Sequence, residues 1–351
     1  MTPRERVWAA LAGREVDRPP VSFWGHAYHR ESTAADLVEA TLETWRRYRW
    51  DWVKLNPRKH YHVEPWGVRY RYPGVPDGKP RLEDWPVRAP TDWARITARP
   101  PEAGALGEQL EAVRLLRRAL PADVPLVETV FTPLAVLGEM VETPQELRAH
   151  LDSHPDLVRG ALEAVTATFA PFVREVLRAG ADGIYFATVD WASADLLTPE
   201  MHRAWSRPWD RRVLAAAADA PFNVLHVCGR RNLLFELGDY PVAAFSWAAT
   251  DPTNPTLADG LARLGGAVMG GIAHDGVLLD GDEAAVRAEV EAARRATGGR
   301  RWLAAPGCSI RPATPPAHLL AARDAVASAR LSSPSAPRSH GGSSSDREVR
   351  P

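Results

Sequence analysis

The sequence alternates short, continuously apolar segments with longer segments of helical periodicity, and this alternation restricts the possible folds more than any other feature. Most of the short segments lack the apolar–polar alternation of half-exposed strands, which is typical of parallel strands covered on both faces. The strand candidates are residues 20–24, 52–55, 125–130, 183–187, 223–226, 243–247, 266–272 and 301–305. The helix candidates are residues 33–48, 105–120, 143–179, 199–218, 256–264, 282–296 and 316–329. Eight strands alternating with helices favour a single (β/α)8 barrel, the TIM-barrel fold, over an open sheet.

Local signals mark several helix ends. Thr198, Pro199 and Glu200 supply, in order, a capping hydroxyl, a first-turn proline and an early acidic residue. The Thr-Pro-Pro sequence at 314–316 offers a similar start. Gly180 follows the longest helical segment and predicts a left-handed C-terminal cap.

Two segments do not fit the alternation. Residues 57–104 are rich in Pro, Trp, Tyr, Arg and His, and they are too long for a simple connection after the second strand. Their aromatic content argues against disorder, so we expect an aromatic-rich insertion that covers part of the barrel mouth. Residues 331–351 are rich in Ser, Pro and Gly and predict a disordered tail, which leaves residues 1–330 as one barrel domain.

The overall charge and the termini exclude several classes of partner. The chain has 43 Lys and Arg against 44 Asp and Glu, so nothing predicts binding to nucleic acid or to an anionic membrane. No apolar run approaches the ~20 residues of a membrane span, and the first residues carry no signal-peptide pattern. We therefore expect a cytoplasmic protein whose two cysteines are reduced; the oligomeric state is not predicted.

Both cysteines follow predicted strands. His226 and Cys228 come at the end of the fifth strand and Cys308 directly follows the eighth, where a TIM barrel places its active site. Alternate residues of an extended segment project to the same side, so His226 and Cys228 could bind one ion. A His/Cys/Cys set suits Zn²⁺ and leaves a fourth, open position, as catalytic zinc sites do. The alternative is structural, because buried free cysteines and single core histidines are common.

Other polar residues lie near predicted strand ends and are candidates for catalysis or for orienting a ligand. They are Glu128 and Thr132 after the third strand, Asp190 after the fourth, and His274 and Asp275 after the seventh. Each could instead cap a helix or bridge a loop. A basic group near the second predicted strand consists of Lys54, Arg58, His60 and His62. These side chains could bind an anionic substrate, or they could belong to a solvated loop.

Four stretches of the sequence resemble the uroporphyrinogen decarboxylase superfamily over about residues 1–330. They are DRPPVSFWGHAYH, GADGIYFATVDWASADLLTPEMHRAW, NVLHVCGRRNLLFEL and GCSIRPATPPAHL, in that order along the chain. The resemblance implies a TIM barrel, in agreement with the independent strand count.

Within this superfamily the motifs resemble the zinc methyltransferases more than the decarboxylases. The methyltransferase pattern is His-x-Cys followed by a cysteine in a Pro-Gly-Cys setting, which His226, Cys228 and Cys308 match. The decarboxylase pattern has two arginines where this chain has Gly25 and His29, and Arg30 is one place late. Two further departures are Asn56 in place of an aspartate and Pro-Gly-Cys at 306–308 in place of Gly-His-Gly.

The resemblance therefore implies a zinc-dependent methyltransferase that acts on a small thiol, with a corrinoid protein as a possible methyl donor. A free thiol has a pKa near 8.5 and is mostly protonated at neutral pH, whereas a zinc-bound thiol is a thiolate. Two alternatives stay open. One is a carboxy-lyase acting on a tetrapyrrole or a smaller acid, and the other is a non-catalytic corrinoid- or tetrapyrrole-binding protein.

Overall fold

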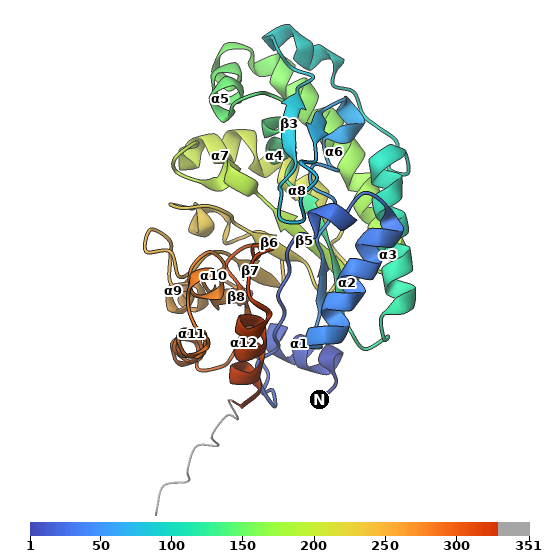
Figure 1. Ribbon diagram of the computed structural model, residues 1–351. Coiled ribbons are helices and arrows are strands. Elements are labelled where there is room, and N and C mark those ends of the chain that lie inside the picture. The colour runs from blue at the N-terminus through green and yellow to red at the C-terminus, as the bar shows by residue number, and fades with distance from the viewer. Residues whose placement is uncertain (329–351) are drawn as a thin grey trace, which may run out of the picture.

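The computed structural model describes residues 1–328 (Figure 1). The predicted tail at 331–351 and the last residue of the predicted helix 316–329 lie outside the described residues. Within the described part, no helix is long and apolar enough to cross a membrane.

Seven parallel strands form one sheet, and their order in the sheet follows their order in the chain, β1-β4-β5-β6-β7-β8-β9. Their bounds are β1 Val53–Leu55, β4 Leu126–Phe131, β5 Gly183–Ala187, β6 Val224–His226, β7 Ala244–Ser246, β8 Ala267–Ile272 and β9 Trp302–Pro306. Sequential parallel neighbours joined by helices are the topology of a TIM barrel, so the predicted fold class is confirmed.

The first predicted strand, residues 20–24, takes its place between β9 and β1 without forming a regular ladder. Val21 makes a single parallel bridge to Ala304. The Ser22 N–H donates to the Ala304 carbonyl at 3.2 Å, and the Asp51 N–H donates to the Val21 carbonyl at 2.9 Å. Pro20 has no N–H to donate, so the ladder cannot extend toward the amino end. This segment joins the two edges of the sheet.

Twelve helices are described, and most surround the sheet (Figure 1). Their bounds are α1 Pro3–Leu11, α2 Ala34–Tyr48, α3 Gly104–Ala119, α4 Pro133–Gly138, α5 Pro144–Ser153, α6 Pro155–Arg178, α7 Pro199–Trp205, α8 Arg207–Ala215, α9 Leu257–Arg263, α10 Val277–Asp280, α11 Glu283–Thr297 and α12 Pro316–Ser328. The sequence did not predict α1, α4 or α10.

Two helices predicted as continuous are each divided in two. The predicted helix 143–179 breaks at His154, which has φ −136° and ψ 53°, because the following Pro155 excludes the helical conformation at the residue before it. The predicted helix 199–218 divides at Ser206, just before Arg207 and Pro208 begin α8. The predicted cap at Gly180 is confirmed: its φ is +107° and its N–H donates to the Leu177 carbonyl at 3.0 Å.

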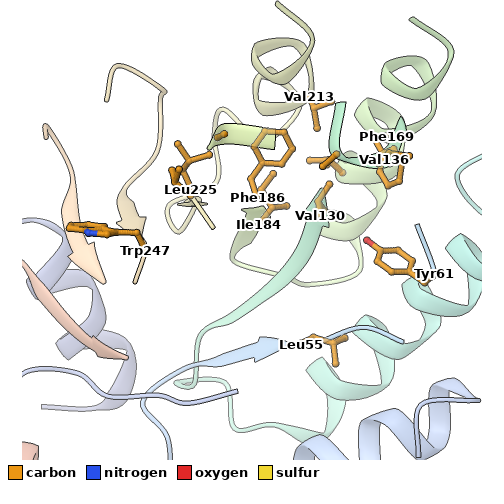
Figure 2. Close-up of a cluster of buried hydrophobic side chains, with 14 of the residues drawn as sticks. Leu55, Tyr61, Val130, Val136, Phe169, Ile184, Phe186, Val213, Leu225 and Trp247 are labelled. Atoms are coloured by element: carbon orange, nitrogen blue, oxygen red, sulfur yellow. The ribbon is translucent and has the colours of Figure 1, made fainter. Parts of the chain in front are cut away.

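Alternating residues of the strands build two separate apolar cores. The outer core lies between the sheet and the helices and contains Leu55, Val130, Ile184, Phe186 and Leu225 (Figure 2). The inner core fills the barrel, and its strand residues include Val127, Tyr185, Val224, Met269 and Leu303. Residues one place apart along a strand therefore point to opposite sides of the barrel wall.

Helix α1 closes the amino end of the barrel. Val7, Ala9 and Ala10 belong to the inner core, and the Trp8 ring meets Phe222, just before β6, at a centroid distance of 5.8 Å. The opposite end, where the strands finish, is left for the polar residues.

The predicted insertion at 57–104 packs at the carboxyl end of β4. It contains a short antiparallel hairpin of β2 (Arg69–Arg71) and β3 (Arg81–Asp84). The Tyr61 hydroxyl donates to the Thr129 carbonyl at 2.7 Å. Glu139, in the turn after α4, lies 3.2 Å from Lys59 Nζ and 2.8 Å from His60 Nδ1. These contacts attach the insertion near the carboxyl end of β4 and the turn after α4.

We expect a buried carboxyl group on α8 to make the protein less stable as the pH rises. Asp210 Oδ2 accepts hydrogen bonds from Ser206 and Tyr240 at 2.8 and 2.9 Å, yet burial raises the pKa of Asp210 to about 7. A raised folded-state pKa adds stability that is complete below the unfolded pKa near 3.9 and is lost as the pH rises through 7. Between pH 5 and 8 the loss is about 2–3 kcal/mol.

The test is the urea midpoint of the wild type and of Asp210→Asn at pH 5 and pH 8. The wild type should lose stability relative to the variant over this interval. Asp219→Asn, at an exposed position after the end of α8, should follow the wild type at both pH values. An equal pH dependence in Asp210→Asn and wild type would contradict the assignment.

Candidate metal centre

The ends of β6 and β9 bring His226, Cys228 and Cys308 together at the carboxyl end of the barrel. Val227 points outward into the outer core, so His226 and Cys228 on either side of it share the inner side. Gly229 then turns the chain with φ +79°. Cys308 lies two residues after β9 ends at Pro306.

The three side chains are close enough to hold one ion. One ring nitrogen of His226 and the two Sγ atoms lie within 4.8 Å of one another. Cys228 Sγ and Cys308 Sγ are 3.8 Å apart, far beyond the bond length of about 2.05 Å of a disulfide. Two sulfurs at about 2.3 Å from a tetrahedral zinc ion lie about 3.8 Å from each other. The observed separation fits this geometry.

The imidazole of His226 is held with one nitrogen left over. Its Nδ1 lies 3.2 Å from Ser246 Oγ, which in turn lies 3.0 Å from the Tyr185 hydroxyl. The His226 and Tyr185 rings stack at 5.2 Å. His226 Nε2 is buried and has no hydrogen-bond partner among residues 1–328. Metal-bound histidines have this arrangement, with the second nitrogen oriented by a polar group.

The two thiols perturb each other. A hydrogen bond joins the two sulfurs; it lowers the pKa of Cys308 well below its usual range, and His226 and His274 lower it further. The same hydrogen bond, followed by burial, raises the pKa of Cys228 well above its usual range. The hydrogen bond thus shifts the two thiol pKa values in opposite directions, and a proton can bridge the two sulfurs. Because metal ligands must be deprotonated, a bound ion would displace it.

Asp190 and His274 lie beside the three candidate ligands. Asp190 belongs to a short 3-10 helix (Val189–Ala192), and its Oδ1 is 3.8 Å from the point where a Cβ on Gly229 would lie. Val189 has φ +48°, which is a strained conformation for a β-branched residue. His274 Nδ1 is 3.5 Å from the corresponding point on Gly307 and 3.6 Å from Asp275. The structure thus brings two of the three predicted catalytic residues to the site.

Glu128 is not at the site, and this corrects the sequence-based expectation. On β4 it alternates with Val127, which faces the barrel interior, so it points outward instead. Its Oε1 accepts a hydrogen bond from Gln109 of α3 at 3.0 Å, and the side chain is completely buried between sheet and helix. Burial raises the pKa of Glu128 well above its usual range. Thr132 is also structural, because its hydroxyl accepts from the Ala135 N–H and caps α4.

The predicted basic group divides into two parts. Arg58 pairs with Glu64 and Glu108, and His60 and His62 are buried against Glu139. These three are neither solvated nor free for a substrate.

Lys54 is the exception within the basic group. It points into the barrel, where its Nζ lies 4.7 Å from the Tyr185 ring centroid and donates to Asn56 Oδ1 at 2.6 Å. Burial lowers the pKa of Lys54 to about 7. It therefore lies next to the ring that stacks on His226.

The sequence did not single out Tyr185 or Ser246. Both are polar groups inside otherwise apolar strand candidates, GIYFA and AAFSW, and that is the only signal they give. Their role depends on strand register: Ser246 pairs with His226 across β6 and β7, and Ala187 pairs with His226 across β5 and β6. Register between parallel strands cannot be read from the two segments separately.

A parallel α/β barrel with a buried histidine and two cysteines converging at the carboxyl ends of its strands defines a TIM-barrel enzyme with a candidate metal centre. The family model for uroporphyrinogen decarboxylase (URO-D) matches residues 2–329. The chain therefore belongs to the uroporphyrinogen decarboxylase family.

Individual relatives include both methyltransferases and decarboxylases. The methylcobamide:CoM methyltransferase MtaA of Methanosarcina barkeri is 26% identical over 344 residues, which cover 92% of this chain and 98% of that protein. A uroporphyrinogen decarboxylase of Alkalilimnicola ehrlichii is 26% identical over 232 residues, 60% of this chain and 62% of that protein. The solved structure of a methyltransferase from Methanosarcina mazei covers 93% of this chain and 98% of its own at a TM-score of 0.76 and 22% identity, which shows the shared fold.

Removing the hydroxyl that orients His226 should weaken metal binding without abolishing it. In Ser246→Ala the Nδ1 contact is lost, and outer hydrogen bonds of this kind contribute roughly 10–100-fold to metal affinity. Competition with a chelating dye measures the zinc affinity of variant and wild type. Ser206→Ala, which removes a buried hydroxyl that donates to Asp210 of α8, is the control and should leave the affinity unchanged. An unaltered affinity in Ser246→Ala would contradict the arrangement.

Proposed function

We propose that this protein is a zinc-dependent methyltransferase that transfers a methyl group, brought by a corrinoid protein, to a small thiol. The observation that carries the proposal is the convergence of His226, Cys228 and Cys308 within 4.8 Å, with a buried His226 Nε2 that has no partner within residues 1–328. The full-length similarity to a methylcobamide:CoM methyltransferase supports the same reaction class.

The donor set suits zinc and leaves room for a substrate. His226 Nε2 and the two thiolates would hold the ion, and two thiolates cancel its charge of +2. When bound, zinc would supply an acceptor thiol in its thiolate form at neutral pH, although a free thiol is mostly protonated there. Among the described residues, no fourth His, Cys, Asp or Glu completes the group.

The surrounding residues would position the reactants. Tyr185 and Ser246 fix the plane of the His226 imidazole through the 3.0 and 3.2 Å contacts described above. Asp190 and His274 flank the cysteines, and we propose that they orient the acceptor thiol. In the transfer, the thiolate sulfur forms a bond to the methyl carbon while the carbon–cobalt bond breaks. The electron pair of the carbon–cobalt bond stays on cobalt, so methylcob(III)alamin becomes cob(I)alamin. The thiolate becomes a methyl thioether.

The carboxy-lyase alternative receives less support from the same region. Gly25 stands where the decarboxylase pattern has its first arginine, and a Cβ there would lie 2.9 Å from the Ile310 carbonyl oxygen. A long side chain at position 25 therefore does not fit this backbone. Loss of carboxylates from uroporphyrinogen I or III by the purified protein would establish the alternative instead.

The direct test is methyl transfer from methylcobalamin to 2-mercaptoethanol by the zinc-loaded protein. Cob(I)alamin appears in the absorbance spectrum under anaerobic conditions, and mass spectrometry identifies 2-(methylthio)ethanol. We expect both products with the wild type and neither with Cys308→Ser. Uptake of 2-mercaptoethanol at pH 7 should also release close to one proton for each thiol, measured with a pH indicator in weak buffer. Zinc-loaded protein that neither transfers the methyl group nor releases the proton would overturn the proposal.

A further inference from the structure

The barrel wall has an opening between β1 and residues 20–24, the segment that lies between β9 and β1. Near the amino end this segment is tied to β1, because the Asp51 N–H donates to the Val21 carbonyl at 2.9 Å and Ser22 Oγ donates to the Trp52 carbonyl at 2.8 Å. Beyond Ser22 no strand pairing joins the two segments in the described chain. A cavity of about 240 Å³ lies there, whereas one water needs roughly 10–15 Å³ on the same scale.

The cavity passes through the wall and does not merely indent it. Its lining includes Trp24, which belongs to the inner core, and Lys54, which reaches the inner-core ring of Tyr185. It also includes Phe23 and Val53, which belong to the outer core. We call this cavity the wall slot. It links the barrel interior to the space under α2 and α12.

Three buried polar side chains that line the wall slot have an unpaired atom. Trp50 Nε1, Asn56 Nδ2 and Thr314 Oγ1 have no hydrogen-bond partner among residues 1–328. The three residues are only 2%, 8% and 7% exposed. Lys54 Nζ donates to Asn56 Oδ1 at 2.6 Å, which leaves the Asn56 NH₂ group as the free donor. Unpaired buried donors are costly, so these three atoms are available to acceptor oxygens of a molecule that enters the cavity.

The inner end of the wall slot lies next to the metal centre. Ser309, the residue after Cys308, lies 3.4 Å from Asn56 Oδ1 through its hydroxyl. Lys54 lies against Tyr185, whose ring stacks on His226. A ligand in the slot would therefore have one end close to the position that the three metal ligands leave open.

The charges and the walls of the slot define the chemistry of the ligand. Arg311 lines the slot and makes no ion pair with any described residue, while Glu31 is bound to His26 at 2.9 Å. The lining therefore contains an acidic side chain as well as basic ones, and Arg311 is a cation that has no ion pair among the described residues and can meet an anionic ligand. Trp45 and Tyr48 supply aromatic walls. Aromatic walls with a few directed donors are typical of sites for small organic molecules.

We infer that the wall slot binds an organic carboxylate with a flat apolar body, held by the free donors of Asn56, Thr314 and Trp50. The further statement that this molecule is the acceptor, with its thiol at the metal centre, rests on the proposed function. The acceptor is then larger than a two-carbon thiol, since most of its contacts are in the slot.

Benzoate is the probe for the slot alone, and isothermal titration calorimetry of the full chain at pH 7 measures its binding. We expect binding to the wild type and to Cys308→Ser with dissociation constants within about threefold of each other. Ala40→Trp places a large ring in the slot from α2 and should weaken binding at least tenfold. Glu39→Trp, at the neighbouring exposed position, is the matched control and should bind like the wild type. Thr314→Val keeps the shape, removes the hydroxyl and should weaken binding severalfold.

A second titration connects the slot to the metal centre. With zinc-loaded protein, Ala40→Trp should weaken binding of 4-mercaptobenzoate at least tenfold and leave binding of 2-mercaptoethanol unchanged. No benzoate binding, or equal binding in Ala40→Trp and wild type, would overturn the slot inference even if 2-mercaptoethanol binds the metal. Benzoate binding without uptake of either thiol would keep the slot as a carboxylate site and overturn the proposed function. Equal 4-mercaptobenzoate binding in Ala40→Trp and wild type would separate the slot from the acceptor.

Discussion

Replacing Cys308 with serine is expected to remove zinc from the protein. The wild type should bind close to one zinc ion per chain. In the variant, the thiolate 3.8 Å from Cys228 Sγ is replaced by a hydroxyl, which stays protonated at neutral pH and is a poor zinc ligand. Because only His226 and Cys228 then remain of the group, the zinc content should fall below about one tenth after dialysis against a weak chelator. Atomic emission spectrometry measures the metal directly.

The control for this prediction is the neighbouring residue. Ser309→Ala alters the same loop after β9 without touching a candidate ligand, and it should retain full zinc. Circular dichroism and thermal unfolding of metal-free samples should be similar in both variants, so that loss of zinc is not confused with loss of the fold. Stoichiometric zinc in Cys308→Ser, or none in the wild type, would refute the metal centre.

Glu139→Ala should be the most destabilising single substitution outside the apolar cores. The Glu139 carboxylate is mostly buried and faces Lys59, His60 and His62 at 3.2, 2.8 and 3.1 Å. Burial alone would raise its pKa, but Lys59 and the two histidines outweigh burial and hold the pKa of Glu139 well below its usual range. Removing one partner of a buried ion pair costs about 3–5 kcal/mol, and with 16% exposure of this side chain we expect about 2–4 kcal/mol.

Urea unfolding at pH 7 measures this effect. Glu142→Ala, an exposed acid three residues further on that makes no ion pair within residues 1–328, should change stability by less than about 0.5 kcal/mol. Because Glu139 attaches the insertion to the turn after α4, proteolysis within residues 57–104 should also become faster in Glu139→Ala. Equal unfolding midpoints for Glu139→Ala and Glu142→Ala would contradict the role given to this carboxylate.

The barrel and the three candidate ligands could be predicted because both depend on local patterns. Continuous apolar runs between amphipathic segments predict buried parallel strands, and in a TIM barrel the carboxyl ends of all strands lie on one side. Once that is accepted, residues after strands far apart in sequence, such as His226 and Cys308, must be near each other. The resemblance to a known family agreed with this placement but was not needed for it.

What the sequence could not provide was the orientation of individual side chains. Glu128 follows a strand start by only a few residues, and a shift of one residue in β4 would turn it from the helix layer to the barrel interior. Its true environment depends on Gln109, which lies on a different element. The same limit applies to Ser246, whose contact with His226 follows from the register of β6 and β7. The wall slot arises because residues 20–24 do not pair with β1 beyond Ser22, and no sequence pattern marks this.

The plug formed by α1 at the amino end also affects the order of events in a reaction cycle. Because α1 closes the amino end, the carboxyl end is the one opening along the barrel axis in the described chain. A corrinoid carried by another protein would block the carboxyl end for as long as it is docked. An acceptor that uses this path would then have to bind before the corrinoid protein, and the product could leave only after the corrinoid protein dissociates. If the acceptor or its product passed through the wall slot instead, this fixed order of binding and release would not apply. Product release at the same rate with and without a bound corrinoid protein would then indicate two separate routes, the carboxyl end of the barrel and the wall slot.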